Sequence, residues 1–253
     1  MAIIEGTIDE MMSKVTTAVK SRSADASLRM QLFRLLAVTG QWSRAENQLD
    51  VAGNLDKSLA LTVLAHRHAL NCEQFRKEVF SGKRAPLFLG EPDRGSALLA
   101  QALAIDGAAA HSMRTEAIDC IDTCAGTINS QSFDWLSDAD SRLGPTLEVY
   151  LDGKYYWVPF SRVLTLQVNE PTDVLDLVWA TAELTLRGGV PQAILLPTRY
   201  PATETSSDDA LRLARRTDWI AIGEEQYRGL GQRMFASNQD EVALLDTRLV
   251  EFS

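Results

Sequence analysis

Three aspartates near the middle of the chain have the residue types and the close spacing that a bound metal ion would need. Asp134, Asp138 and Asp140 are followed at once by Arg142. An EF-hand calcium loop also needs a glycine at its sixth position and a glutamate at its twelfth, and this segment has neither. We therefore expect the carboxylates to cap backbone N–H groups or to pair with Arg142. The alternative is a metal-dependent or hydrolytic enzyme that uses Asp138, Asp140 and Arg142.

Two further pairs have the spacing of metal ligands on a helix. His68 and Cys72 are four positions apart, as are Cys120 and Cys124. Residues at that spacing share a helix face, so two packed helices could offer one histidine and three cysteines to zinc. The short Cys-x-x-Cys knuckle is missing, and an isolated cysteine behaves as a small buried apolar residue. We expect no metal and no cofactor.

Other catalytic motifs are missing from the sequence. There is no Gly-x-Ser-x-Gly elbow and no phosphate-binding Gly-x-x-x-x-Gly-Lys loop, and the segment Gly229-Leu230-Gly231 lacks the third glycine of a dinucleotide fingerprint. All the histidines lie in the first half of the chain, at positions 66, 68 and 111. The sequence therefore predicts a protein that is not an enzyme.

The overall charge excludes one class of partner. The 253 residues carry a net charge of −9, whereas nucleic-acid binding needs concentrated lysine and arginine. The run Arg212, Arg215 and Arg216 is typical of a solvated face that pairs with local acids such as Asp208 and Asp209. The sequence predicts no nucleic-acid partner.

The composition also indicates a cytoplasmic protein. Apolar runs such as Leu98–Ile105 are much shorter than the roughly 20 residues that span a bilayer, and the first residues do not resemble a secretory signal. The cysteine count of 3 is odd and low, which fits reduced thiols. We expect no membrane association, while a homo-oligomer remains open.

The positions of the apolar residues predict a helical first half. Leucines recur at helical spacing before Gly40, and Trp42, Ala45 and Leu49 recur after it, which indicates two helices joined by a tight turn. This spacing is also similar to half of a tetratricopeptide repeat. Residues 58–81 predict a helix that is apolar on more than one side and therefore central. Further helices are expected over 95–105 and 112–123.

From about residue 125 the pattern changes to short β-prone runs. We expect strands over 146–151, 154–158, 163–168, 183–186, 193–196, 232–236 and 242–250, with a helix over 208–216. The fold class is thus α+β with two domains. Residues 1–127 form an all-α domain similar to tetratricopeptide repeats, and residues 128–253 form an α+β domain that contains a β-hairpin.

The hairpin is the sharpest local prediction. Asp152-Gly153 favours a two-residue type I′ turn, which sets Tyr150 opposite Tyr155. One face of the hairpin then carries four residues, namely Glu148, Tyr150, Tyr155 and Trp157. Tyrosine and tryptophan are enriched where proteins bind other proteins, so we propose this face as a protein-binding site. The alternative is that the face is buried against the helical domain, because large aromatic residues are mostly buried.

Several ordered blocks of the sequence resemble the ImpE/SciE family, also called the TagJ type. The blocks lie at Val38–Ala45, Val79–Pro86, Pro86–Pro92, Phe133–Phe160, Pro197–Pro201, Asp208–Thr217 and Gly229–Met234. One departure is Lys57 after Asp56, where many repeat helices have a proline, and it weakens only the similarity to a repeat.

The resemblance implies a cytoplasmic accessory protein of bacterial type VI secretion, a virulence-associated machine. Family members are associated with the contractile sheath through the N-terminal helical segment of its small subunit. They are thereby linked indirectly to the AAA+ ATPase that disassembles the sheath. The expected partner is therefore that helical segment. A groove between helices can receive a partner helix through its apolar face.

Overall fold

The computed structural model of the chain describes residues 6–89 and 91–253. Residues 1–5, whose sequence is unlike a secretory signal, and Gly90 of the Pro86–Pro92 block lie outside the described residues. Within the described part, no helix combines the length and the apolar character that crossing a membrane requires.

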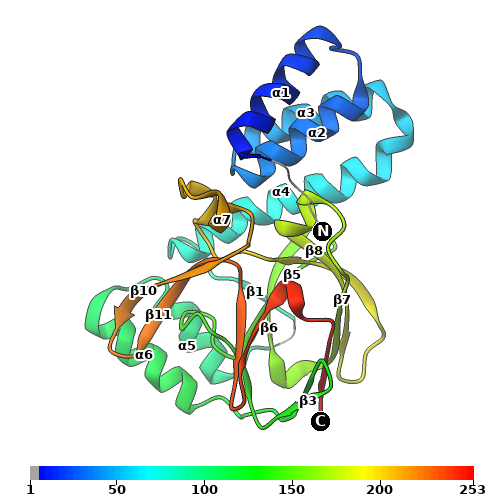
Figure 1. The fold of residues 1–253 in the computed structure, drawn as a ribbon. Helices are drawn as coiled ribbons and strands as arrows, with labels where there is room; N and C mark the ends of the chain where they lie inside the picture. Colours follow the sequence, from blue (N-terminus) through cyan, green and yellow to red (C-terminus); the bar gives the residue numbers. More distant parts are fainter. Residues whose placement is uncertain (1–5, 90) are drawn as a thin grey trace.

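Helices occupy most of the first half of the chain, as expected (Figure 1). Thr7 begins α1 by a capping box with Glu10, and Gly40 and Gly82 follow α2 and α4 with φ angles of +65° and +71°, which glycine adopts without strain. The helices are α1 (Ile8–Ser21), α2 (Ala26–Val38), α3 (Trp42–Leu55), α4 (Ala60–Phe80), α5 (Arg94–Ala102), α6 (Gly107–Asp119) and the short α7 (Asp209–Arg212).

A mixed sheet of 9 strands forms the body of the second half, in the order β1-β6-β5-β9-β8-β7-β14-β2-β3. Its strands are β1 (Leu87–Phe88), β2 (Gly126–Ile128), β3 (Gln131–Phe133), β5 (Thr146–Leu151), β6 (Lys154–Pro159), β7 (Val163–Val168), β8 (Trp179–Leu186), β9 (Gln192–Pro197) and β14 (Leu249–Phe252). A small sheet joins β4 (Leu136–Asp138), β12 (Met234–Ser237) and β13 (Glu241–Ala243), and a separate ribbon pairs β10 (Thr217–Gly223) with β11 (Gln226–Gly231). The α+β class is therefore confirmed.

Helix α4 links the helical part to the sheet (Figure 1). Its buried residues, such as Leu70 and Val79, are 1% and 0% exposed, as expected for a central helix. The prediction of burial on more than one side is wrong near its beginning, because Leu61 is 82% exposed and Leu64 is 46% exposed. The first half of α4 thus presents apolar side chains to solvent.

The β5–β6 hairpin has the predicted register. Tyr150 pairs with Tyr155 and Glu148 with Trp157 across the two strands. The turn residues Asp152 and Gly153 both have positive φ angles, +50° and +74°, as a type I′ turn requires. The turn chemistry alone was sufficient to fix this part of the fold.

Several segments differ from the prediction. The helix expected over 208–216 is only the four-residue α7, because Ala214 has a φ of +50° that interrupts it. The strand expected over 242–250 is divided into β13 and β14. Residues 126–133, for which no strand was predicted, form the strands β2 and β3. The β10–β11 ribbon was not predicted at all; its turn residues Glu224 and Glu225 lack the Asn-Gly or Asp-Gly signal of a tight hairpin.

Two glycines offer a matched test of how the hairpin turn packs on α4. Gly153 and Gly188 both have a φ of +74°, but a Cβ at Gly153 would lie 2.9 Å from the imidazole Cγ of His68, whereas one at Gly188 would meet nothing within 4 Å. We expect Gly188→Ala to lower the free energy of unfolding by about 1 kcal/mol through backbone strain alone. Gly153→Ala should cost about 1 kcal/mol more. Urea denaturation measures both, and equal losses would contradict the contact.

Candidate functional site

The four side chains predicted to bind a partner are brought together, but they are buried. Exposed fractions are 0% for Glu148, 4% for Tyr150, 1% for Tyr155 and 0% for Trp157. They pack against α4, where the ring of Phe75 lies 6.1 Å from that of Tyr155. This is the arrangement that the burial alternative describes. A partner could contact these side chains directly only if α4 were displaced.

Glu148 is the centre of a buried network of charges and hydrogen bonds. Its carboxylate accepts hydrogen bonds from Nε and Nη2 of Arg76, at 2.6 and 2.8 Å, and from the Tyr155 hydroxyl at 2.5 Å. Arg233 lies on its other side, with Nη1 at 3.3 Å from Oε2. Trp157 in turn donates its indole N–H to the Tyr155 hydroxyl at 2.5 Å. One buried carboxylate therefore joins α4, the hairpin and the segment that begins β12.

The charges of this network are mutually compensated. Burial alone would raise the pKa of Glu148, but the two guanidinium groups of Arg76 and Arg233 overcome it, so the pKa lies below its ordinary value. Burial and the neighbouring Glu148 hold the pKa of the Tyr155 hydroxyl well above its usual range. Glu148 is thus ionised and Tyr155 is a neutral donor at neutral pH, so the buried charges of the network balance one another.

The aspartates considered as a metal or catalytic site are engaged by other groups of the protein, and the Asp138 carboxylate also caps the backbone N–H of Asp140 at 2.9 Å. The Asp140 carboxylate accepts hydrogen bonds from Nε and Nη2 of Arg142 at 2.9 and 2.6 Å, and from the Arg142 backbone N–H. Asp138 accepts from Arg233 at 2.7 Å and from the Tyr200 hydroxyl at 3.0 Å. The expected capping and pairing with Arg142 is therefore confirmed for Asp140. Asp134 instead accepts from the amide of Asn238.

Burial closes this loop to a substrate. Asp138 and Asp140 are 2% and 0% exposed. Burial raises the pKa of Asp138 to about 6, against the opposing effect of Arg233. Asp138 and Asp140 each already have a cationic partner, namely Arg233 and Arg142.

The histidine and cysteine pairs do not meet as the zinc hypothesis required. Cys72 is buried within α4, and burial raises the pKa of its thiol to about 12, so the thiol stays protonated. Cys120 follows α6 and Cys124 lies beyond it. In the described ranges, no three histidine, cysteine or acidic side chains gather where they could hold a metal ion.

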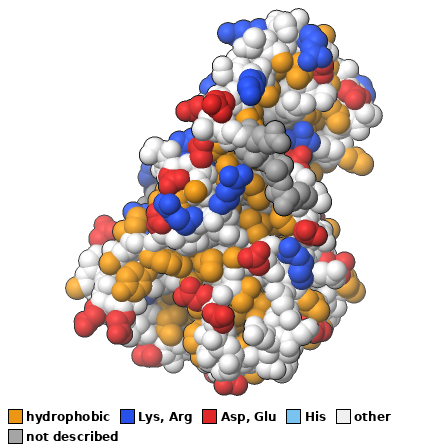
Figure 2. Space-filling model, in the orientation of Figure 1, with side chains coloured by type: hydrophobic (Ala, Val, Ile, Leu, Met, Phe, Trp, Pro, Cys, Tyr) orange, Lys and Arg blue, Asp and Glu red, His pale blue; other side chains and the backbone are white. Residues whose placement is uncertain are grey.

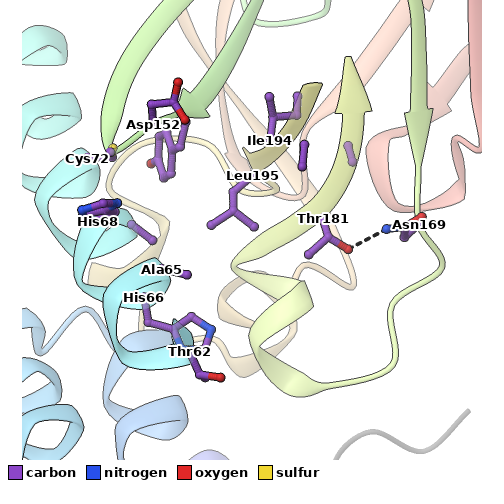
Figure 3. Close-up of a pocket in the computed structure, with 15 residues that line it drawn as sticks. Thr62, Ala65, His66, His68, Cys72, Asp152, Asn169, Thr181, Ile194 and Leu195 are labelled. Carbon is purple, nitrogen blue, oxygen red and sulfur yellow. Dashed lines mark hydrogen bonds between the residues drawn. The ribbon is translucent and has the colours of Figure 1, made fainter. Parts of the chain in front are cut away.

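A groove opens between α4 and the sheet, beside the aligned pair of Tyr150 in β5 with Leu195 in β9. The hairpin turn contacts α4 through Gly153 and His68, and a cavity of about 530 Å³ remains. Figure 3 shows residues of α4, among them Ala65 and His68, on one side, with Ile194 and Leu195 of β9 on the other. The groove is open to solvent and mostly apolar.

The outer face of α4 continues this apolar surface. Leu61, Leu64, Ala65 and His68 follow the spacing i, i+3, i+4 and i+7, which places them on one face, and the last two line the groove. We call these four residues the α4 stripe. An exposed apolar stripe on a helix beside a groove is the surface to which an amphipathic helix binds. Sequence reasoning missed it, although the spacing was visible.

Removing the charge of Glu148 should destabilise the junction. Glu148→Gln leaves buried Arg76 with only the more distant Glu73, at 3.9 Å, and leaves Arg233 with Asp138 alone, so we expect the free energy of unfolding to fall by about 3 kcal/mol. The control is Glu78→Gln, which removes an exposed ion pair with Arg84 and should cost less than about 0.5 kcal/mol. Urea denaturation distinguishes the two, and similar losses would refute the central role of Glu148.

His66 should make the stability depend on pH. Burial, reinforced by Arg34, lowers the pKa of His66 to about 4, and its Nδ1 atom is buried without a hydrogen-bond partner. The unfolded chain binds a proton near pH 6.5, so stability present above that pH is lost as the pH falls toward 4. Between pH 7 and 4.5 the unmodified chain should lose about 2 kcal/mol more than His66→Gln. Parallel pH profiles in chemical denaturation would contradict this assignment.

Comparisons with known proteins agree with this fold. The family model described as "ImpE protein" matches residues 130–251. The type VI secretion system accessory component TagJ of Pseudomonas aeruginosa is 44% identical over 98% of this chain and 88% of its own length. A Vibrio parahaemolyticus protein with a known crystal structure shares the fold with a TM-score of 0.87 at 25% identity, over 97% of this chain and 94% of that one. The chain therefore belongs to the ImpE family, of the TagJ type.

Proposed function

We propose that this chain is a non-enzymatic accessory component of a type VI secretion system that binds the N-terminal helical segment of the small contractile-sheath subunit. The accessory role is supported by the Pseudomonas relative, which is named as such a component. The nature of the partner comes from the family resemblance, and the α4 stripe with its groove supports binding of a helix. Through this contact the chain would be linked to sheath assembly or to ATPase-driven disassembly in the cytoplasm.

The observation that carries the proposal is the exposure of Leu61. An exposed fraction of 82% for a leucine, beside Leu64 at 46%, leaves apolar area in water that a partner helix would remove. Burial of one such side chain contributes about 1.5–3 kcal/mol. Within the same helix, Cys72 and Leu70 are each 1% exposed, so the stripe is a local feature and not a general property of α4.

The location of the groove also suits an adaptor. It lies between α4, in the proposed repeat-like helical domain of residues 1–127, and β9, in the proposed α+β domain of residues 128–253. The Glu148 network holds these two parts together, so a bound helix would enter a groove whose two sides do not move relative to each other. Preformed surfaces of this kind lose little entropy on binding.

The test is calorimetric titration with a synthetic peptide of the N-terminal helix of the cognate sheath subunit. Leu61→Asp and Leu64→Asp place a charge in the stripe, and we expect the dissociation constant to rise roughly tenfold to a hundredfold. Val190→Asp is the matched control, because Val190 is 72% exposed and does not line the groove. Thermal unfolding of each variant checks that the fold is retained.

The outcomes separate the partner from the surface. Binding by the unmodified chain and by Val190→Asp, with loss in both stripe variants, supports the proposal. Equal binding by all four proteins would contradict the α4 stripe while keeping the partner. Failure of the unmodified chain to bind the peptide would refute the proposed partner itself.

A further inference from the structure

Strand β10 has an outer edge that no described strand covers, although its C-terminal end packs on α6, where Arg114 donates to the Ile222 carbonyl and Gly223 lies against His111. Figure 2 shows hydrophobic side chains gathered over this ribbon, and the exposed ones include Trp219 at 37%, Ile220 at 38% and Tyr227 at 46%. Strand β10 pairs only with β11 among the described strands. A β-strand edge that is apolar and carries no lysine or proline is a template for pairing with another strand.

The outer edge of β11 is occupied, and this fixes the direction of the backbone groups of β10. The N–H of Gly229 donates to Asp140, and the N–H and C=O of Tyr227 bond Ser141. These groups point away from β10. In an antiparallel ladder, two residues directly opposite one another either both direct their backbone N–H and C=O groups toward the partner strand or both direct them away from it. Trp219 lies opposite Gly229 and Ala221 lies opposite Tyr227, so the backbone groups of Trp219 and Ala221 point away from β11. Within the described residues, neither has a backbone hydrogen bond on that outer side.

The charges on either side of β10 indicate what can pair with this edge. The strand is preceded by Arg215-Arg216 and followed by Glu224-Glu225. Figure 2 likewise shows basic side chains beside α7 and acidic ones at the far end of the ribbon. Arg216 already bonds Asp208 and Asp218. Within the part of the chain that the structure describes, no ion pair engages Arg215 or either glutamate. A strand with opposite charges at its two ends is complementary to an antiparallel copy of itself.

We propose that two copies of this chain associate by antiparallel pairing of β10 with β10, around a two-fold axis at Ile220. In this register Trp219 pairs with Ala221 of the second copy, and both have outward N–H and C=O groups for the ladder. A large side chain then stands beside a small one. Arg215 and Arg216, which precede the strand, then lie at the same end of the ladder as Glu224 and Glu225, the turn residues of the second copy. The two ribbons become one four-stranded sheet.

Neighbouring registers fit less well. A two-fold axis at Ala221 moves Asp218 toward Glu224 in the turn of the second copy, and neighbouring like charges are destabilising. An axis at Trp219 sets the two tryptophans against each other and moves Arg216 away from both glutamates. The axis at Ile220 therefore satisfies the backbone, the side-chain volumes and the charges together. The surface is separate from the α4 stripe, so this inference does not depend on the proposed partner.

The test is sedimentation velocity of the full chain from micromolar to submillimolar concentration. We expect a reversible dimer that Ala221→Pro abolishes, because proline removes an N–H that points outward and leaves the ladder to β11 intact. Arg215→Glu and Glu225→Arg should each raise the dissociation constant of the dimer roughly tenfold. The double variant restores opposite charges across the axis and should return the constant close to that of the unmodified chain.

Each outcome decides the proposal. A chain that is monomeric at every concentration overturns it and leaves the edge to a strand of another protein. A dimer that is insensitive to Ala221→Pro, in a variant whose thermal unfolding is normal, places the contact elsewhere and also overturns it. If Ala221→Pro does not fold, the charge variants decide, since failure of the double variant to recover dimerisation rejects the register.

Discussion

The fold depends on the cost of removing the Glu148 carboxylate from water. A carboxylate that is 0% exposed is tolerated only when opposite charge and hydrogen bonds surround it. Arg76 supplies this from α4 and Arg233 from the segment that begins β12, 72 residues before and 85 residues after it in the chain. Displacing any of the three segments would expose a charged side chain to water or leave one buried without its partner. The junction between helices and sheet is therefore specified more sharply than apolar packing alone would specify it.

That constraint explains which parts of the fold could be predicted from sequence. The hairpin register followed from Asp152-Gly153 and alternation, both of which are local signals. The surroundings of its polar face are not local, since the side chain that neutralises Glu148 lies on a helix far away in sequence. The same four residues fit an exposed binding face and a buried network equally well until Arg76 is placed. The local sequence gives the residues on the hairpin face, but only the packing of the distant helix shows that this face is buried.

The missed surfaces have similar explanations. In α4, apolar residues on several sides predicted burial everywhere, but Leu61 and Leu64 in its first half stay exposed. In β10, the turn residues Glu224 and Glu225 lack a hairpin signal, and the helix expected over 208–216 would end directly before the strand. Both surfaces therefore became visible only when neighbouring elements could be located.

The two halves of helix α4 have different roles: the second half anchors the helix to the hairpin, and the first half carries the exposed α4 stripe. Glu73, Arg76 and Phe80 in its second half hold it to the hairpin through hydrogen bonds, an ion pair and a tilted contact between the rings of Phe80 and Trp157. This anchorage fixes the rotation of the helix about its axis, and the direction of the α4 stripe in the first half follows from it by the 3.6-residue period. The exposed leucines are thus presented in one orientation by a buried charge several turns away. A chain that must offer a fixed apolar surface to a partner, while staying folded without it, needs such an anchor, because apolar packing alone would favour rotating those leucines inward.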